Sequence, residues 1–175
     1  MAEQDRENVQ QIRERVMRMA RQIDELSQSN VPPQFFFHEF LNRIVSALGG
    51  RAGAVWMRRG PQIELVSDVR LAEIGFFEKP DAKPLNDKIL ANVLSTGEAV
   101  GYHPADPQDT PLPTDHLIIV AALQKGSECV GAVEVFQRYR AEPFRALLNR
   151  WGGAYVAFNG IVAAAAFWVA TEAEG

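Results

Sequence analysis

The stretch that decides the fold is Pro84 to Arg138, PLNDKILANVLSTGEAVGYHPADPQDTPLPTDHLIIVAALQKGSECVGAVEVFQR. Leu85, Ile89 and Val93 recur every four residues, which is the spacing of one face of an α-helix. Gly97 follows this pattern and is the residue type that most often ends a helix in a left-handed conformation. Two apolar runs, 117–123 and 129–136, flank a polar turn and predict a long β-hairpin.

This order of elements resembles a GAF domain. The resemblance rests on the pattern PL…I…V…TGE-V, followed by a strand, a turn containing Gly, and a strand with Gly between hydrophobic residues. It covers about residues 34 to 165. It implies an α+β fold, an antiparallel sheet with flanking helices that lie on one of its faces. It implies little about function, because one fold serves many ligands or none.

A separate helix is predicted before this domain, over residues 6–28. Its hydrophobic residues recur at spacings of three and four, which is a heptad pattern: Val9, Ile12, Val16, Met19, Ile23 and Leu26. So narrow a stripe needs a partner, either its own domain or a second chain in a parallel coiled coil, and we favour the coiled coil. We therefore divide the chain into a coiled-coil helix (1–30), a GAF-like domain that includes a C-terminal helix (31–170) and a tail (171–175).

Within the domain, helical spacing covers residues 34–48, and strands are predicted at 52–57 and 63–65. The irregular segment 68–83 and the loop 101–115, with four prolines, complete the middle of the chain. The resemblance implies that these two segments cover a ligand cavity. Long loops in compact domains are often functional, but they can also simply be long.

Six residues are the candidate ligand contacts on this basis. Trp56 and Phe77 are the expected apolar lining, and the polar groups near the rim are Tyr102, His103, Asp115 and His116. His116 directly precedes a predicted strand, so its position is better fixed than that of His103. The alternative is that these residues pack the loop onto the domain and bind nothing.

Composition and motifs argue against several other functions. A net charge of −4 and a pI near 5.4 argue against nucleic-acid binding. The three histidines have no metal-ligand spacing, so no metal is expected. No Gly-x-Gly-x-x-Gly or P-loop pattern appears, and no cofactor is expected. The single cysteine, Cys129, excludes an internal disulfide and is expected to be a buried small hydrophobe.

The resemblance leads to further negative expectations. Cyclic-nucleotide-binding GAF domains carry an Asn-Lys…Phe-x-x-x-Asp-Glu signature that this chain lacks. Bilin-binding relatives need a cysteine near the pocket, and methionine-sulfoxide-reducing relatives need several cysteines. Since no catalytic constellation is found in the sequence either, we expect that the chain is not an enzyme.

The C-terminal segment allows two interpretations. Trp151 to Ala170 holds no charged residue and has the length of a membrane span. Its glycines and alanines make it weakly hydrophobic, and a heptad pattern begins before it: Phe144, Leu148, Trp151, Tyr155, Phe158 and Val162. We favour a buried helix, packed on its sheet and on a partner, over a membrane span.

Two functions remain after these exclusions. The first is a non-catalytic regulatory or sensor module that homodimerises through its terminal helices and binds an unidentified small ligand. The second is a structural, ligand-free cytoplasmic head of a membrane-associated transport assembly, since Gln22 to Leu48 is similar to the segment before GAF-like heads of HlyD-type membrane-fusion adaptors. Because the N-terminus has no apolar run, we expect a cytoplasmic location, with membrane association through a partner as the alternative.

Overall fold

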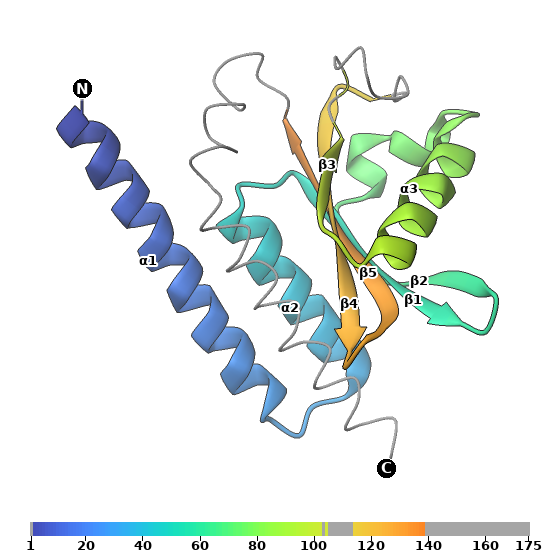
Figure 1. The fold of residues 1–175 in the computed structure, drawn as a ribbon, viewed down its shortest axis with the longest axis horizontal. Helices are drawn as coiled ribbons and strands as arrows, with labels where there is room; N and C mark the ends of the chain where they lie inside the picture. Colours follow the sequence, from blue (N-terminus) through green and yellow to red (C-terminus); the bar gives the residue numbers. More distant parts are fainter. Residues whose placement is uncertain (1, 103, 105–113, 139–175) are drawn as a thin grey trace.

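The structure is a computed structural model that describes residues 2–102, 104 and 114–138 (Figure 1). In the first helix, only the backbone is described for residues 2–9, 12, 13, 15 and 16. The elements in chain order are α1 (Ala2–Ser27), α2 (Pro33–Ala47), β1 (Ala52–Arg59), β2 (Gln62–Val69), the short 3-10 helices η1 (Ala72–Ile74) and η2 (Phe76–Glu78), α3 (Ala82–Thr96), β3 (Val100–Tyr102), β4 (His116–Lys125) and β5 (Glu128–Arg138).

The strands form one antiparallel sheet in the order β2-β1-β5-β4-β3. The predicted α+β class, with an antiparallel sheet and flanking helices, is therefore confirmed. At the centre, Glu134 of β5 lies between Ala54 of β1 and Val120 of β4. The short edge strand β3, which sequence analysis assigned to the loop, pairs its Tyr102 with Ile118.

Helices cover both faces of the sheet, so the expectation that they lie on one face is wrong. Figure 1 shows α1 and α2 on one side, and α3 with η1 and η2 on the other. The reason is visible in β4, where every residue from Leu117 to Leu123 is buried. Successive strand residues point to opposite faces, so a continuous apolar run requires cover on both sides.

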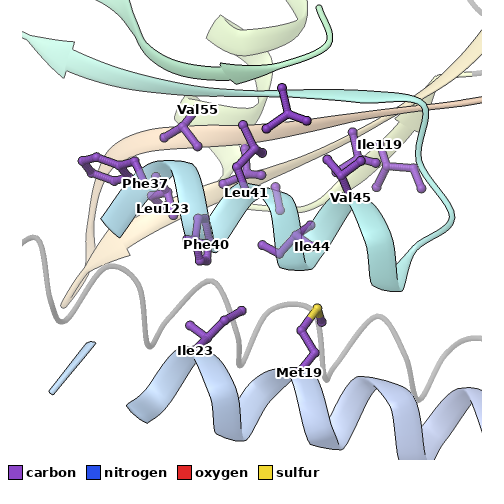
Figure 2. Close-up of a cluster of buried hydrophobic side chains, with 14 of the residues drawn as sticks. Met19, Ile23, Phe37, Phe40, Leu41, Ile44, Val45, Val55, Ile119 and Leu123 are labelled. Carbon is purple, nitrogen blue, oxygen red and sulfur yellow. The ribbon is translucent and has the colours of Figure 1, made fainter. Parts of the chain in front are cut away.

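The last third of α1 packs on α2 of the same chain (Figure 2). Met19 and Ile23 are 4% and 0% exposed, and they lie in one apolar cluster with Phe40 and Ile44. The intrachain alternative thus accounts for this part of the heptad pattern. Because α1 has 26 residues and α2 has 15, α1 is eleven residues longer, or roughly 16 Å at 1.5 Å per residue.

Helix α3 ends as its sequence predicts. Gly97 has a φ of 70°, and its N–H donates to the carbonyl oxygen of Val93 at 2.8 Å. The helix begins at Ala82, and Pro84 is tolerated because it lies in the first turn. Cys129 is only half-buried, contrary to expectation, because it lies beside the exposed turn at the start of β5.

The predicted C-terminal helix, including residues 151–170, and the tail 171–175 lie outside the described residues. Among the helices of the described part, none is long and apolar enough to cross a membrane.

Candidate functional site

A buried carboxyl group lies between the sheet and α3. The side chain of Glu134 is at the centre of β5 and has no exposed surface. Its neighbours on this face of the sheet include the small residues Ala54 and Ala132, which leave room above the strands for larger groups. That room is occupied by side chains from β1, η2 and α3.

Two donors bind one oxygen of this carboxyl group. The indole Nε1–H of Trp56 donates to Glu134 Oε2 at 2.6 Å, and Asn86 Nδ2 donates to the same oxygen at 3.4 Å. The other oxygen, Oε1, is buried and has no hydrogen-bond partner among the described residues, and the same holds for Asn86 Oδ1. Buried polar atoms are nearly always paired, so these two atoms mark an incomplete polar site.

Burial shifts the ionisation of this carboxyl group. The pKa of Glu134 rises from 4.5 to about 7, chiefly because burial removes water from the charged form. The hydrogen bonds from Trp56 and Asn86 lower the pKa, and the nearby charge of Asp87 raises it. Near neutral pH both forms of the carboxyl group are populated, so its charge depends on what contacts it.

Aromatic rings form a wall beside the carboxyl group. The Trp56 and Phe77 rings meet edge to face at 6.0 Å, and Phe76 contacts Phe77 at 4.8 Å and Phe136 at 5.3 Å. Phe76 is buried, whereas Trp56 and Phe77 are half-buried. The cluster therefore meets solvent at the last two rings, with the carboxyl group behind them.

The sequence-predicted residues fall into two groups. Trp56 and Phe77 lie together in this cluster, and Tyr102 packs against its apolar part while its hydroxyl accepts from Asn92 Nδ2 at 3.1 Å. All three lie on the α3 face of the sheet. Their role as ligand contacts remains a prediction.

The second group lies at the end of the sheet. His116 Nδ1 is 2.9 Å from Asp115 Oδ1 and 3.2 Å from Thr114 Oγ1, so its ring is engaged locally. His116 pairs with Arg138, four residues along β5 from Glu134, or roughly 13 Å at 3.3 Å per residue. The structure does not bring His116 and Asp115 to the carboxyl group, and His103 lies outside the described residues.

Sequence analysis missed Glu134 and Asn86. A single acid inside the apolar strand CVGAVEVF was the available signal, because a carboxyl group there must be buried and needs a partner. Asn86 occupies the same helix face as Leu90 and Val93, so its spacing also indicated burial.

A groove lies on the opposite face of the sheet, between α1 and α2. This groove of about 380 Å³ is lined by Arg18, Met19, Gln22, Asn42, Arg43, Ser46 and Ala47. Its polar side chains are exposed or half-buried, so water can solvate them. The buried carboxyl site is the stronger candidate, because its two unpartnered atoms cannot be satisfied in that way.

Comparison of the chain with known proteins finds matches among solved structures only. No family model and no curated protein matches the chain. The GAF domain of A. aeolicus nlh2 in an inactive state is 16% identical with a TM-score of 0.64, over 92% of this chain and 99% of that one. The GAF domain of an Acinetobacter phosphoenolpyruvate-protein phosphotransferase is 12% identical with a TM-score of 0.64, over 91% and 95%.

A third similar structure is an enzyme with a bound small molecule. Free methionine-R-sulfoxide reductase from Neisseria meningitidis, in complex with its substrate, is 11% identical with a TM-score of 0.60, over 90% of this chain and 91% of that one. At such low identities, these likenesses establish the fold and not the activity.

Proposed function

Because the chain has a GAF-like fold, we propose that it is a non-catalytic regulatory module that binds a small ligand between its sheet and α3. The observation that carries this proposal is the pair of buried, unpartnered oxygens, Glu134 Oε1 and Asn86 Oδ1. An unsatisfied buried polar group costs about 1–3 kcal/mol, and a ligand that bonds to it recovers that cost. The substrate complex of the reductase supports the capacity of this fold to hold a small molecule.

The non-catalytic part of the proposal rests on cysteine content. The resemblance implies that sulfoxide-reducing relatives use several cysteines, and this chain has one. Cys129 is half-buried at the start of β5, five residues before Glu134, and its Sγ lies 3.8 Å from Gln124 Nε2.

A thermal-shift screen of nucleotides, small acids, tetrapyrroles and small amines tests the ligand site. A ligand present at 100 times its Kd stabilises the folded state by about 2.7 kcal/mol. This should raise Tm by roughly 5–10 °C for a chain of this length. Asn86→Ala should abolish the increase. The control Asn42→Ala, on the opposite face of the sheet, should keep it.

Two results would contradict the proposed site. A screen in which no compound raises Tm would remove its support. An increase that survives Asn86→Ala but is lost in His116→Ala would place the ligand at the rim, near the residues that sequence analysis chose.

The specific observation that favours the alternative function is the aromatic packing. The Phe77 ring packs on Phe76 at 4.8 Å and on Trp56 at 6.0 Å, and such mutual aromatic packing is expected of a structural module without a ligand. The HlyD-type assignment, which rests on Gln22 to Leu48, gains no support from the three structures described above. The thermal-shift screen distinguishes the two functions, because only a ligand-binding module should show an increase in Tm.

We also propose that the module homodimerises through α1. The first eleven residues of α1, by which it exceeds α2 in length, carry Val9 and Ile12 from the first half of the heptad pattern. A hydrophobic stripe on a helix without a neighbour needs a second chain to cover it. The predicted C-terminal contribution, residues 144–165, lies outside the described part of the chain.

Light scattering on a double variant tests the dimer. Val9→Asp with Ile12→Asp should convert the dimer to a monomer, because it places charges in the proposed seam. The matched control, Gln10→Asp with Gln11→Asp, adds the same charge at two exposed positions and should leave the dimer intact. A monomeric unmutated chain would contradict the proposal. Ile23 is unsuitable for this test because it is buried against its own α2.

A further inference from the structure

We infer that the site binds its ligand through a cationic nitrogen, an ammonium or amidinium group seated between Glu134, Asn86 and the Trp56–Phe77 rings. This inference rests on the proposed ligand site and adds the chemical class of the group that enters it.

When Glu134 is ionised, both unpartnered atoms accept hydrogen bonds. Asn86 directs its Nδ2 donor to Glu134 Oε2, which leaves the amide oxygen Oδ1 without a donor. Glu134 Oε1 is a carboxyl oxygen that likewise lacks a donor. These atoms belong to two groups in mutual contact, so one small group with several N–H donors can serve both. A ligand carboxylate or phosphate would place its negative oxygens against the ionised carboxylate of Glu134.

The charges around Glu134 favour a cation over a neutral donor. No ion pair among the described residues includes Glu134, and the charge that acts on it is that of Asp87, a second acid. Asp87 is itself paired with Lys83 at 2.9 Å on the exposed side of α3. A buried carboxylate without a cationic partner is costly, so a positive ligand group supplies what the protein lacks.

The aromatic wall suits the same ligand group. Trp56 donates to the carboxyl group and packs on Phe77, and both rings are partly exposed, so they are the aromatic surface nearest to the site that solvent reaches. The faces of aromatic rings attract cations, and tryptophan does so most strongly.

A cation should bind more tightly as pH rises. The carboxyl group of Glu134, with a pKa of about 7, is mostly protonated at pH 6 and mostly ionised at pH 8. Only the ionised form pairs with a cation, so apparent affinity should increase by about tenfold over this range. Binding at pH 6 should release a proton.

The test uses three flat probes of equal size on the full chain: benzamidine, which is cationic, benzamide, which is neutral, and benzoate, which is anionic. The NMR resonance of the Trp56 indole N–H, assigned with Trp56→Phe, reports contact at the site. At pH 8, benzamidine should bind at least about tenfold more tightly than benzamide, and benzoate should not bind. In Glu134→Gln the preference for benzamidine should fall to within about twofold, while the exposed control on the same strand, Glu128→Gln, should keep it.

The outcomes separate this inference from the proposed function. If benzamide or benzoate moves the Trp56 resonance as readily as benzamidine does, the cationic class is overturned. The proposed ligand site is then still supported. If no probe moves the resonance, both the cationic class and the proposed ligand site are overturned. If Glu134→Gln does not fold, the unmutated chain alone provides the test. An equal affinity of that chain for benzamidine at pH 6 and pH 8 would overturn the inference.

Discussion

At pH 8, Glu134→Gln is expected to stabilise the fold by roughly 3 kcal/mol relative to the unmutated chain, and at pH 5 by less than about 1 kcal/mol. Burial raises the pKa of Glu134 to about 7, so between pH 4.5 and pH 7 the folded state holds a proton that the unfolded state has lost. Folding stability therefore falls as pH rises through this window and levels off above it. Glutamine keeps an oxygen for the Trp56 indole N–H and carries no charge.

Urea unfolding at pH 5, 6, 7 and 8 measures this effect. The difference in unfolding free energy between Glu134→Gln and the unmutated chain should grow across the series. Glu128→Gln, at an exposed position on the same strand, should follow the unmutated chain at every pH. A constant difference between the curves would show that Glu134 has the same pKa in the folded and unfolded states.

The sequence predicts most of the fold, because the fold depends on local patterns. The helix that ends at Gly97 and the hairpin of β4 and β5 follow from spacing and turn residues alone. The strand β3 was missed because three residues carry almost no periodic signal, and its pairing with β4 supplies its stability. The second covered face was missed although the unbroken apolar run at 117–123 already indicated it.

The site is less predictable, because its contacts connect distant parts of the chain. Trp56 and Phe77 could be chosen as large aromatic residues near the expected cavity. The hydrogen bonds of Glu134 cross 78 residues to Trp56 and 48 residues to Asn86. Only the register of β1 against β5 and the position of α3 bring these groups together, and neither can be read from residue spacing.

Gly131→Ala is expected to destabilise the fold by about 3 kcal/mol or more, because β5 has no room for a side chain at this position. A Cβ at Gly131 would overlap the carbonyl oxygen of Trp56 on β1 and would lie 2.8 Å from Met57 Sδ and 3.3 Å from Leu123 Cδ1. A flexible methionine can turn aside, but a backbone oxygen within a sheet cannot, so β1 and β5 would have to separate.

Gly101→Ala is the matched control, since it makes the same substitution in β3. The nearest atom to a Cβ at Gly101 is Leu117 Cδ1 at 4.0 Å, an ordinary contact. Alanine there should be neutral or stabilise by up to about 1 kcal/mol, because glycine weakens a strand interior. Urea unfolding measures the free energy of unfolding of both variants. Equal changes in the two variants would contradict the steric explanation.

The same substitution should disturb the candidate site. Gly131 pairs with Met57, next to Trp56, and Glu134 pairs with Ala54 on the same two strands. The close approach that Gly131 permits therefore also sets the distance of 2.6 Å between the Trp56 indole nitrogen and Glu134 Oε2. In Gly131→Ala, the indole N–H resonance of Trp56 should move, whereas Gly101→Ala should leave it in place. This glycine is the one between hydrophobic residues on which the GAF resemblance rests, and the steric contact gives it a physical reason in this chain.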